Sequence, residues 1–461
     1  MKVLLIKPHS TSDHIQPSVG LGYLATAIRR HGQVRILDCI KQKLPSIRIG
    51  EVIKNYRPDI VGMQCYTSDL SSVKVALGII KKVDKKIVTV VGGPHPSAKA
   101  EESMLYFNDS IDFIFKGECE KPFSDFVEQV KKKDINLHSI PGITWKDARG
   151  IHSNTAYFEE DLDSLGMPAW DLIRPENYPE AQHGAFYKKF PIAPIMLTRG
   201  CPYPCTFCAG RVISGTRLRK RSIEAVLEEI RILYQNHGIR EFHIIDDNFT
   251  LDTVYAKAFL RKLISEDLDI SLATPNGVRL DTLDEELLCL MKESGFYLIS
   301  VGIESGSERI LQLMKKGLSV CKIREKILLI RSHGINVAGF FILGFPGESR
   351  RDMLKTIDFS LDLGLLRANY FTFLPFPGTE SYEKLTVSGE LKNVSLRRFH
   401  FMSAAYAPGG MTRCELRQWQ RLAFFRFYSR PGIFLNNFSN IKSWRHFLHL
   451  LKRFIRWAIL S

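Results

Sequence analysis

The chain has 461 residues, of which 45% are hydrophobic, and this is enough for two or three domains with substantial cores. Its net charge of +15 is uneven, because residues 412–461 contain ten Lys or Arg and only one Glu. Positive charge confined to one end, without a recognisable binding module, argues against a nucleic-acid partner.

Residues 1–135 alternate strand and helix patterns, which predicts a doubly wound, Rossmann-like parallel sheet. The expected strands are Lys2–Ile6, Val34–Asp38, Ile60–Gln64, Ile87–Val91 and Phe113–Phe115. Met1 to Pro8 contain no secretory signal, and no later stretch is apolar enough to span a bilayer. The nine cysteines are scattered, which suits a reducing compartment. We therefore expect a cytoplasmic protein.

The ends of these strands carry small and polar residues that an apolar core would not require. They are Tyr66, Thr67 and Ser68, then Gly92 and Gly93, and then Gly117 and Glu118. Ligands bind outside the carboxyl ends of such strands, where glycine lets the backbone approach closely. There is no G-x-G-x-x-G after the first strand, so a dinucleotide is not indicated.

Residues 136–186 include the Pro-rich run 167–175 and are expected to be a linker. Residues 187–400 repeat strand and helix patterns again, with strands expected at 192–197, 241–246, 270–275, 297–303, 336–343 and 369–374. Six such units predict a partial (β/α)6 barrel rather than the full eight, with its site at the carboxyl ends of the strands.

The loop after the first barrel strand contains Cys201, Cys205 and Cys208 in the spacing C-x3-C-x2-C. Zinc sites and iron-sulfur clusters usually have four protein ligands. A compact triplet therefore indicates either a cluster with one open iron, or a zinc site completed by a distant His or Cys.

Three further strand ends supply candidate binding residues, namely Asp246, Arg279 and Glu304. A guanidinium such as that of Arg279 forms two-pronged pairs with carboxylates. The alternative is that these segments supply helix caps and tight turns, with Asp246 and Ser305 as caps.

The cysteine triplet and the strand ends that follow it resemble the radical S-adenosylmethionine (SAM) enzymes. The resemblance implies a [4Fe-4S] cluster on Cys201, Cys205 and Cys208 whose fourth iron binds SAM, and cleavage of SAM to a 5′-deoxyadenosyl radical. It also implies that Phe207 lies beside the adenine, that Asp246 contacts the SAM amino group, and that Glu304 contacts the ribose or methionyl portion.

Residues 1–135 resemble the cobalamin-binding domain that precedes many radical SAM enzymes. The matching pieces are 20–25, Tyr66 to Ser68, Gly92 to His95 and Gly117 to Glu120. The D-x-H-x-x-G motif that supplies a cobalt ligand in other cobalamin folds is absent, because Asp13 and His14 are adjacent. His95 is a candidate ligand, but local hydrogen bonding is the expected role of a histidine in a Gly-Pro loop.

The two resemblances together are to the cobalamin-dependent radical SAM family, whose best-known members methylate unactivated carbon or phosphinate phosphorus. They imply a methyltransferase acting on a small molecule or lipid, with an electron donor such as flavodoxin or ferredoxin. No catalytic residue is singled out. Other members of the family oxidise or cyclise their substrates, and that alternative stays open.

Two further alternatives remain at this point. Cys39, Cys65 and Cys119 each follow a strand, and could hold a second cluster as in methylthiotransferases, although buried unreactive thiols are the simpler interpretation. The chain could also be a non-catalytic corrinoid- or SAM-binding module.

Residues 401–461 are expected to form a basic, helical C-terminal segment. Helical spacing relates Trp444, Phe447, Leu448, Leu451, Phe454, Ile455 and Ala458, with Lys442, Arg445, Lys452, Arg453 and Arg456 among them. Such a helix either lies on an anionic membrane surface, which would make the protein membrane-peripheral, or packs its apolar face on the barrel.

Overall fold

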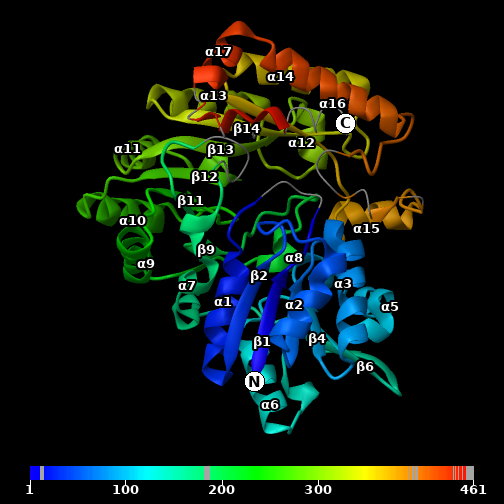
Figure 1. Cartoon of the computed structure of the whole chain (residues 1–461). Coiled ribbons are helices and arrows are strands. Elements are labelled where there is room, and N and C mark those ends of the chain that lie inside the picture. Colours follow the sequence, from blue (N-terminus) through cyan, green and yellow to red (C-terminus); the bar gives the residue numbers. More distant parts are fainter. Residues whose placement is uncertain are drawn as a thin grey trace.

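The computed structural model describes residues 1–10, 15–180, 187–392, 394–396, 399, 403–439, 441, 443–444, 446–448 and 450–452, with the backbone alone for 436–439. Asp13 and His14 lie outside the described residues, as do Lys442, Arg445 and all residues after 452. Two sheets, each flanked by helices, lie one above the other in Figure 1, the N-terminal sheet below and the later one above.

The first sheet has the strand order β2-β1-β3-β4-β5-β6-β7. Its parallel strands are β1 (Lys2–Lys7), β2 (Gln33–Asp38), β3 (Ile60–Gln64), β4 (Val88–Gly92) and β5 (Phe113–Phe115). Successive residues of β1 face opposite sides, so that Leu4 and Ile6 enter one core while Val3 and Leu5 enter the other. A strand buried on both faces reads as a continuous apolar run, and this is why the sequence identified these strands.

Helices cover both faces of this sheet. Two of them lie on the face of Val3, namely α1 (Val19–Ile28) and α6 (Glu120–Lys132). The other face carries α2 (Ile49–Tyr56), α3 (Leu70–Val83) and α5 (Ala100–Phe107), while the short α4 (Pro94–Ala98) follows β4 directly. The predicted Rossmann-like layering is confirmed.

The sheet continues beyond residue 135, which the sequence analysis did not anticipate. An antiparallel hairpin, β6 (Ile143–Asp147) and β7 (Gly150–Ser153), adds to the edge at β5, within the segment expected to be a linker. Only one strand of the hairpin buries its side chains deeply, so the hairpin contains few apolar residues. After it come the short α7 (Trp170–Ile173) and the described start of the second unit at Tyr187.

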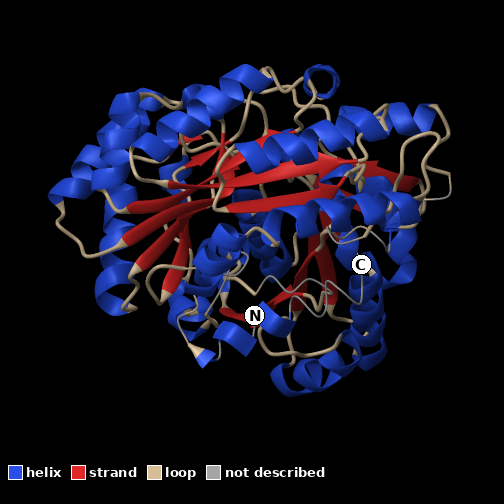
Figure 2. Cartoon of the chain, turned by 90° about the horizontal axis from the view of Figure 1, so that it is seen from above, coloured by secondary structure: helices blue, strands red, loops and turns tan. Residues whose placement is uncertain are grey.

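The second sheet contains six parallel strands in the order β15-β14-β13-β12-β11-β8. They are β8 (Ile192–Ile195), β11 (Glu241–Ile244), β12 (Ser271–Val278), β13 (Phe296–Glu304), β14 (Asn336–Leu343) and β15 (Arg367–Thr372). β8 and β15 do not pair with each other, so the predicted partial barrel is confirmed. Figure 2 shows these strands fanning out beneath an outer layer of helices.

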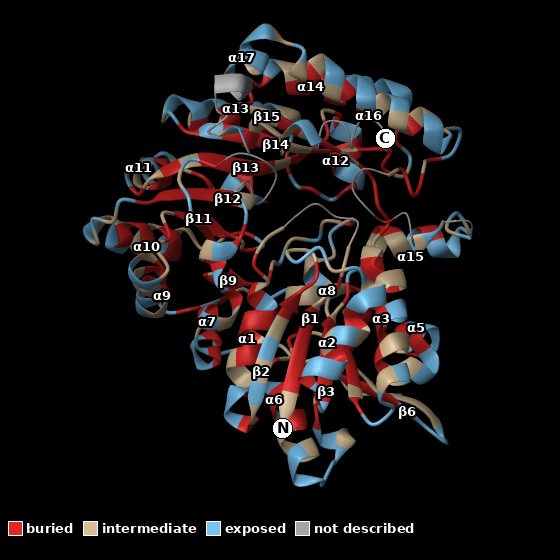
Figure 3. Cartoon of the chain, in the orientation of Figure 1, coloured by how far each residue is buried: buried red, intermediate tan, exposed pale blue. Residues whose placement is uncertain are grey.

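The outer helices begin at side-chain caps that the sequence carries. Ser222, Asp252, Asp284, Ser319 and Ser349 each accept a hydrogen bond from the backbone N–H three residues on. The helices that they cap are α9 (Ile223–Asn236), α10 (Thr253–Ser265), α11 (Glu285–Glu293), α13 (Val320–Ser332) and α14 (Arg350–Asp362). Figure 3 shows their outward faces exposed while the strands beneath are buried.

Shorter elements complete the second unit. The ribbon of β9 (Thr198–Arg199) and β10 (Arg219–Lys220) flanks the cysteine loop, and α8 (Gly210–Ser214) follows the third cysteine. Near the other edge of the sheet lie α12 (Glu308–Leu313) and α15 (Glu380–Val387).

The C-terminal region is helical, as expected. α16 (Arg413–Tyr428) buries Leu416, Ala423 and Phe427 against the barrel, and α17 (Pro431–Ser439) follows it. Further on, Ser443 bonds Glu180 and the ring of His446 lies 5.3 Å from that of Tyr187, whereas Trp444 is 70% exposed. Of the predicted tail helix, Phe454, Ile455, Ala458, Arg453 and Arg456 lie outside the described residues. Among the residues described, none of the helices combines the length and the apolarity needed to cross a membrane.

Candidate active site between the two sheets

The carboxyl ends of the two sheets face each other across the join between the two units. On the β8 side, Glu118 after β5 bonds Arg219 of β10. On the β15 side, Gly378 lies close to α4 of the first unit and to α8 of its own unit. A Cβ placed on Gly378 would lie 3.2 Å from Ala98 of α4 and 3.0 Å from Val212 of α8. Loops from both units therefore contact each other where the two sets of strand ends meet.

The cysteine loop begins at a ribbon that the barrel holds in place. Asp246, at the end of β11, accepts hydrogen bonds from the backbone N–H groups of Leu197 and Thr198 and from the Thr198 hydroxyl. Gly200 then turns the chain with φ +93°, where a Cβ would lie 2.1 Å from the carbonyl oxygen of Arg217. Only glycine fits this position, immediately before Cys201.

The three thiols share one environment. Burial raises the pKa of Cys208 to about 11, and the neighbouring Cys205 and Cys201 add to that rise. Cys208 nevertheless remains accessible to solvent. Within the described residues, no three His, Cys, Asp or Glu side chains are spaced as ligands of a single ion. A four-iron cluster binds each thiolate through a different iron, so its sulfurs need not lie as close as around one zinc ion. One loop with three thiols and an open side fits such a cluster.

Phe207, just before the third cysteine, packs against apolar residues at the mouth of the barrel. The cluster that it joins contains Ile310, Met314, Phe345, Phe373, Leu385 and Tyr406. The backbone N–H of its neighbour Thr206 donates to the carbonyl of Met314. The far end of the cysteine loop is thereby fixed to the β14 and β15 side.

The structure places Asp247, rather than the predicted Asp246, beside the thiols. Asp246 is 3% exposed and both of its carboxylate oxygens accept hydrogen bonds from the ribbon, so it acts as a structural staple. Asp247 is exposed, and its Oδ1 and the Sγ of Cys208 both lie within 3.6 Å of the position that a Cβ on Gly210 would take. Asp246 does not cap a helix, because its oxygens accept hydrogen bonds from the ribbon. Ser305 does not cap one either, because its hydroxyl bonds that of Thr356.

Arg279 lies beside the cysteine loop, but its guanidinium is already engaged. It donates to both carboxylate oxygens of Asp281 and to the carbonyl of Lys316, and it stacks 3.6 Å from the ring centroid of Tyr203. Tyr203 lies between Cys201 and Cys205, so Arg279 supports that loop from the barrel side. The sequence missed Tyr203 because a single aromatic residue in a loop carries no pattern.

Glu304 ends β13 in an unusual arrangement. Its backbone has φ +65°, a conformation rare outside glycine, and its carboxylate forms a buried ion pair of 2.8 Å with Lys316. A Cβ on Gly302 would lie 2.4 Å from Glu304 Oε1 and 2.8 Å from Lys316 Nζ, so the pair lies directly over that glycine. Lys316 was not predicted, since a lysine twelve residues from its partner gives no local signal.

The edge of the first sheet presents glycine backbone and hydroxyl groups. Thr67 Oγ1 lies 3.0 Å from His95 Nδ1, and burial lowers the pKa of His95 to about 4, so the imidazole is neutral. This is the local hydrogen bonding expected of His95. Tyr66 is 46% exposed, and Ser68 donates to Asp69.

The glycines at this edge bring neighbouring strand ends together. Gly93 has φ +110°, and a Cβ there would lie 3.1 Å from backbone atoms of Cys65, while Gly92 accepts from the Cys65 N–H. Gly117 has φ +76° and lies against Tyr157 in the same way. These close contacts keep the strand ends free of bulky side chains, and this suits the approach of a flat corrin ring to the edge.

Glu118 has a different place from the one predicted. Instead of facing the open edge, its carboxylate pairs with Arg219 of the barrel unit in a two-pronged geometry, at 2.7 and 2.8 Å. It is 7% exposed. The sequence could not distinguish a ligand contact from an interdomain contact, because Arg219 lies about a hundred residues further on.

The topology excludes a second cluster on Cys39, Cys65 and Cys119. These residues follow β2, β3 and β5, and four strand spacings separate β2 from β5. At about 4.8 Å per spacing β2 and β5 lie about 19 Å apart. The Cys119 sulfur leans toward β4, which still leaves it several strand spacings from Cys39, and no three metal-ligand side chains among the described residues are grouped there. Cys39 and Cys65 are buried, as unreactive thiols usually are.

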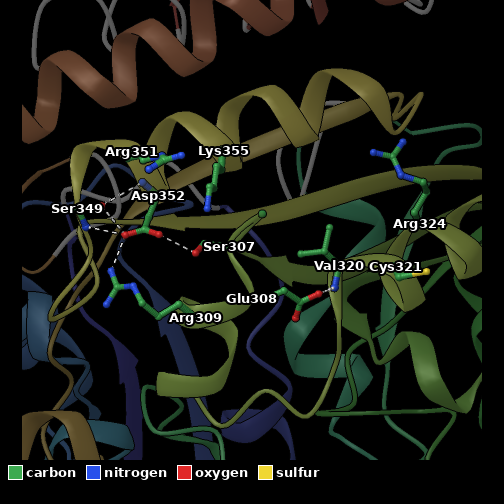
Figure 4. A pocket seen from close by; sticks show the side chains of 11 residues that line it. Ser307, Glu308, Arg309, Val320, Cys321, Arg324, Ser349, Arg351, Asp352 and Lys355 are labelled. Atoms are coloured by element: carbon green, nitrogen blue, oxygen red, sulfur yellow. Dashed lines mark hydrogen bonds and ion pairs between the residues drawn. The ribbon is translucent and has the colours of Figure 1, made fainter.

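A pocket of about 910 Å³ lies away from the thiols, between the starts of α12, α13 and α14. Figure 4 shows Arg309, Arg324, Arg351 and Lys355 around it, with Asp352 at the centre of a hydrogen-bonded group. None of its lining residues belongs to the cysteine loop or to the first sheet. It is an open groove between helices rather than the site of the chemistry.

A three-thiol loop at the mouth of a partial barrel, facing the ligand-binding edge of a Rossmann-like sheet, defines an enzyme with two cofactors. Comparison with known proteins agrees. Residues 195–360 match the radical SAM superfamily and residues 9–127 match the B12 binding domain.

Relatives match over nearly the whole chain. An uncharacterized methyltransferase of Pyrococcus horikoshii is 29% identical, across 99% of this chain and 97% of its own. The cytidylyl-2-hydroxyethylphosphonate methyltransferase of Streptomyces wedmorensis is 31% identical, across 82% and 80%. The fold resembles the radical SAM methyltransferase TsrM of Kitasatospora setae, solved with cobalamin and a [4Fe-4S] cluster, with a TM-score of 0.70, 18% identity, and coverage of 91% and 81%.

The chain belongs to the radical SAM superfamily, in the branch whose radical SAM domain follows a B12-binding domain. The predicted class, a cobalamin-dependent radical SAM methyltransferase, is confirmed, and so are its predicted cofactors, a [4Fe-4S] cluster, SAM and cobalamin.

Proposed function

We propose that this enzyme adds a methyl group to an unactivated centre of a small molecule or lipid held between its two sheets. The observation that carries the proposal is the facing of the two strand edges, one with the three thiols and one with the glycine and hydroxyl surface. When bound, cluster and SAM supply a 5′-deoxyadenosyl radical, and cobalamin supplies the methyl group.

The chain's own residues would hold and shield the reactants. Cys201, Cys205 and Cys208 would ligate the cluster, and Phe207 would cover the adenine from the β14 side. Asp247 and Glu304 would accept hydrogen bonds from SAM. Tyr66, Thr67, Ser68, Gly92, Gly93 and Gly117 would receive the corrin rim. The loops that join the two units would exclude water.

The test uses anaerobically reconstituted protein with SAM carrying a deuterated methyl group, added to a metabolite extract of a deletion strain. We expect S-adenosylhomocysteine and 5′-deoxyadenosine in equal amounts, and one metabolite that gains a single labelled methyl. Deoxyadenosine alone, with an oxidised or cyclised metabolite, would replace this proposal with the non-methylating chemistry. A chain that yields no deoxyadenosine with reductant and SAM would be a binding module only.

A one-electron donor completes the reaction, and we propose a small acidic one, flavodoxin or ferredoxin. Arg211, on the short helix directly after Cys208, is exposed and is suited to meet an acidic partner. Flavodoxin with its reductase should replace dithionite in deoxyadenosine formation, and Arg211→Glu should slow the flavodoxin-driven rate while leaving the dithionite-driven rate unchanged. Equal effects on both rates would contradict this role.

We also place the protein in the cytoplasm, in peripheral contact with an anionic membrane through its C-terminal helices. The support is the ten Lys or Arg against one Glu in residues 412–461, together with exposed Phe434 and Leu435 on α17. A lipid substrate would be favoured if this contact is measured.

A further inference from the structure

A buried group of two carboxylates and two guanidiniums joins the two units at the cysteine ribbon. Its members are Glu118 from the loop after β5, Glu120 at the start of α6, and Arg199 and Arg219 from the β9–β10 ribbon. All four are between 4% and 8% exposed. The charges balance, so the group is neutral as a whole, and we call it the interdomain ion cluster.

The contacts of the interdomain ion cluster are short and directional. Arg219 pairs with both oxygens of Glu118, and it also donates to the carbonyls of Glu159 and Ser214. Arg199 donates to Glu120 at 2.8 Å and lies 3.4 Å from Glu118. Two-pronged guanidinium pairs fix orientation as well as distance.

On the barrel side, the cluster acts on the residues that carry the first thiol. Arg199 is separated from Cys201 only by the strained Gly200, and the Cys201 N–H donates to the carbonyl of Gly215, next to Ser214. On the other side, Glu118 and Glu120 immediately follow Gly117, whose left-handed turn ends the ligand-binding edge. The four residues from Gly117 to Glu120 therefore connect the ligand-binding edge of the first sheet to the cysteine loop.

The aromatic rings of Tyr23 and Phe158 each cover one guanidinium of the cluster. The ring of Tyr23, on α1, faces the guanidinium of Arg199 at 5.2 Å, and the ring of Phe158 faces that of Arg219 at 5.7 Å. Buried ion pairs add little net stability but are specific in geometry. Such an arrangement is suited to fixing the position of one unit relative to the other, beyond simply holding the two units together.

We propose that the interdomain ion cluster is a positioning device that couples cobalamin binding at the first sheet to the order of the cysteine loop. Glu118 and Glu120 would be restrained when cobalamin is bound at the Gly117 edge. Their ion pairs would in turn restrain Arg199 and Arg219, and thereby the position of Cys201. The inference rests on the cofactors assigned above and requires neither the substrate nor methyl transfer.

The experiment measures iodoacetamide alkylation of each cysteine in the full-length, cluster-free, reduced chain, with and without hydroxocobalamin. In the wild type we expect cobalamin to slow alkylation of Cys201, Cys205 and Cys208 by about fivefold or more, the range of ordinary coupling between sites. The exposed Cys289, Cys321 and Cys414 provide internal references whose rates should not change.

Glu118→Gln removes one charge of the cluster and should bring the ratio of the two rates close to one. Because coupling is reciprocal, cobalamin affinity by equilibrium dialysis should fall by about the same factor by which cobalamin slows alkylation in the wild type, about fivefold. Arg219→Lys keeps the charge but loses the two-pronged geometry, so an intermediate ratio is expected, and this milder variant serves if Glu118→Gln does not fold. The matched control is Glu229→Gln, which breaks the buried Arg221–Glu229 pair nearby on the same unit and should keep the wild-type ratio.

Four results would overturn the proposal. Equal slowing in the wild type and in Glu118→Gln would mean that the corrin merely shields the thiols. A loss of cobalamin affinity in Glu118→Gln much larger than the factor by which cobalamin slows alkylation in the wild type would make Glu118 a ligand contact, and binding without slowing in the wild type would show no coupling. A wild type that binds no hydroxocobalamin would contradict the cofactor assignment as well, which separates the two failures.

Discussion

Glu348 follows β14 in a loop at the mouth of the barrel and is 4% exposed. Its Oε2 accepts the backbone N–H groups of Gly344 and Phe345, whereas Oε1 has no partner among the described residues. Burial raises the pKa of Glu348 to about 8 from its ordinary 4.5. The carboxyl group is therefore protonated at neutral pH and shapes the loop as a neutral group.

This gives a pH dependence of defined sign. Because the pKa is higher in the folded chain than in the unfolded one, the contribution is complete below pH 4.5 and is lost as pH rises toward 8. Glu348→Gln cannot titrate, so between pH 5 and 8 the wild type should lose on the order of a few kcal/mol of unfolding free energy relative to the variant. Urea unfolding at both pH values measures this, and parallel pH curves would refute it.

Cys205 supplies the most direct test of the cluster loop. Cys205→Ala should lower bound iron and sulfide and reduce 5′-deoxyadenosine formation to background, because two thiolates hold a four-iron cluster poorly. Iron, sulfide and deoxyadenosine are assayed after anaerobic reconstitution. Cys321→Ala, at an exposed cysteine on α13, is the control and should match the wild type. Turnover that survives in Cys205→Ala would remove the cluster from this loop.

At this scale the thiols form a local pattern in the sequence, whereas the partners of the candidate carboxylates do not. Three cysteines in eight residues form a local pattern that few functions other than metal binding explain. Asp246 and Glu118 also follow strands, but their partners, Thr198 and Arg219, lie 48 and 101 residues away. Whether such a carboxylate contacts a ligand or bonds another part of the protein depends on that distant partner, which spacing along the chain does not reveal.

Among the elements, β13 offers a sharp test at Gly302, above which the Glu304–Lys316 pair lies. Gly302→Ala would place a methyl group in the space of that pair and should cost about 1–3 kcal/mol of unfolding free energy. The affinity for SAM should also fall if Glu304 contacts it. Chemical unfolding and equilibrium dialysis with labelled SAM measure the two effects.

The control is Gly432→Ala on α17, where a Cβ would meet nothing within 4 Å. It should leave both stability and SAM affinity close to those of the wild type. If Gly302→Ala lowered stability alone, Glu304 would be a structural residue, and its assignment to SAM would be wrong.

The elements themselves were largely predictable because most of them bury continuous or periodic apolar faces. All eleven expected strands appear in the two sheets, and the helix caps at Ser222 and Asp284 are visible in the sequence. The β6–β7 hairpin was missed because only Ile143, Thr144 and Trp145 are deeply buried in it. Edge hairpins with little apolar content resemble loops when only the sequence is considered.

For the whole molecule, the apposition of the two strand edges was beyond sequence reasoning. It depends on contacts such as Glu118 with Arg219 and Gly378 with Ala98, which join residues of separate units. The family resemblance implied that both cofactors serve one reaction, and the structure is consistent with this, since loops from the two strand edges contact each other.

The surface of the C-terminal region carries the last prediction. α16 and α17 expose Phe425, Phe434 and Leu435 at 69%, 61% and 66%, in the segment that holds most of the excess positive charge. Exposed aromatic and leucine side chains among arginines suit the boundary between lipid headgroups and acyl chains. The protein should therefore co-sediment with vesicles containing phosphatidylglycerol, more weakly at high salt, and little with pure phosphatidylcholine.

Phe434→Ser combined with Leu435→Ser should weaken this partitioning about tenfold, because two apolar side chains no longer leave water. Val254→Ser on α10 removes an equally exposed apolar side chain elsewhere and should have no effect. Equal binding by both variants would assign the exposed residues to another partner, and binding that ignores salt would contradict the role of the arginines. Only vesicle binding that depends on both charge and these side chains makes a membrane-borne substrate the first class to screen.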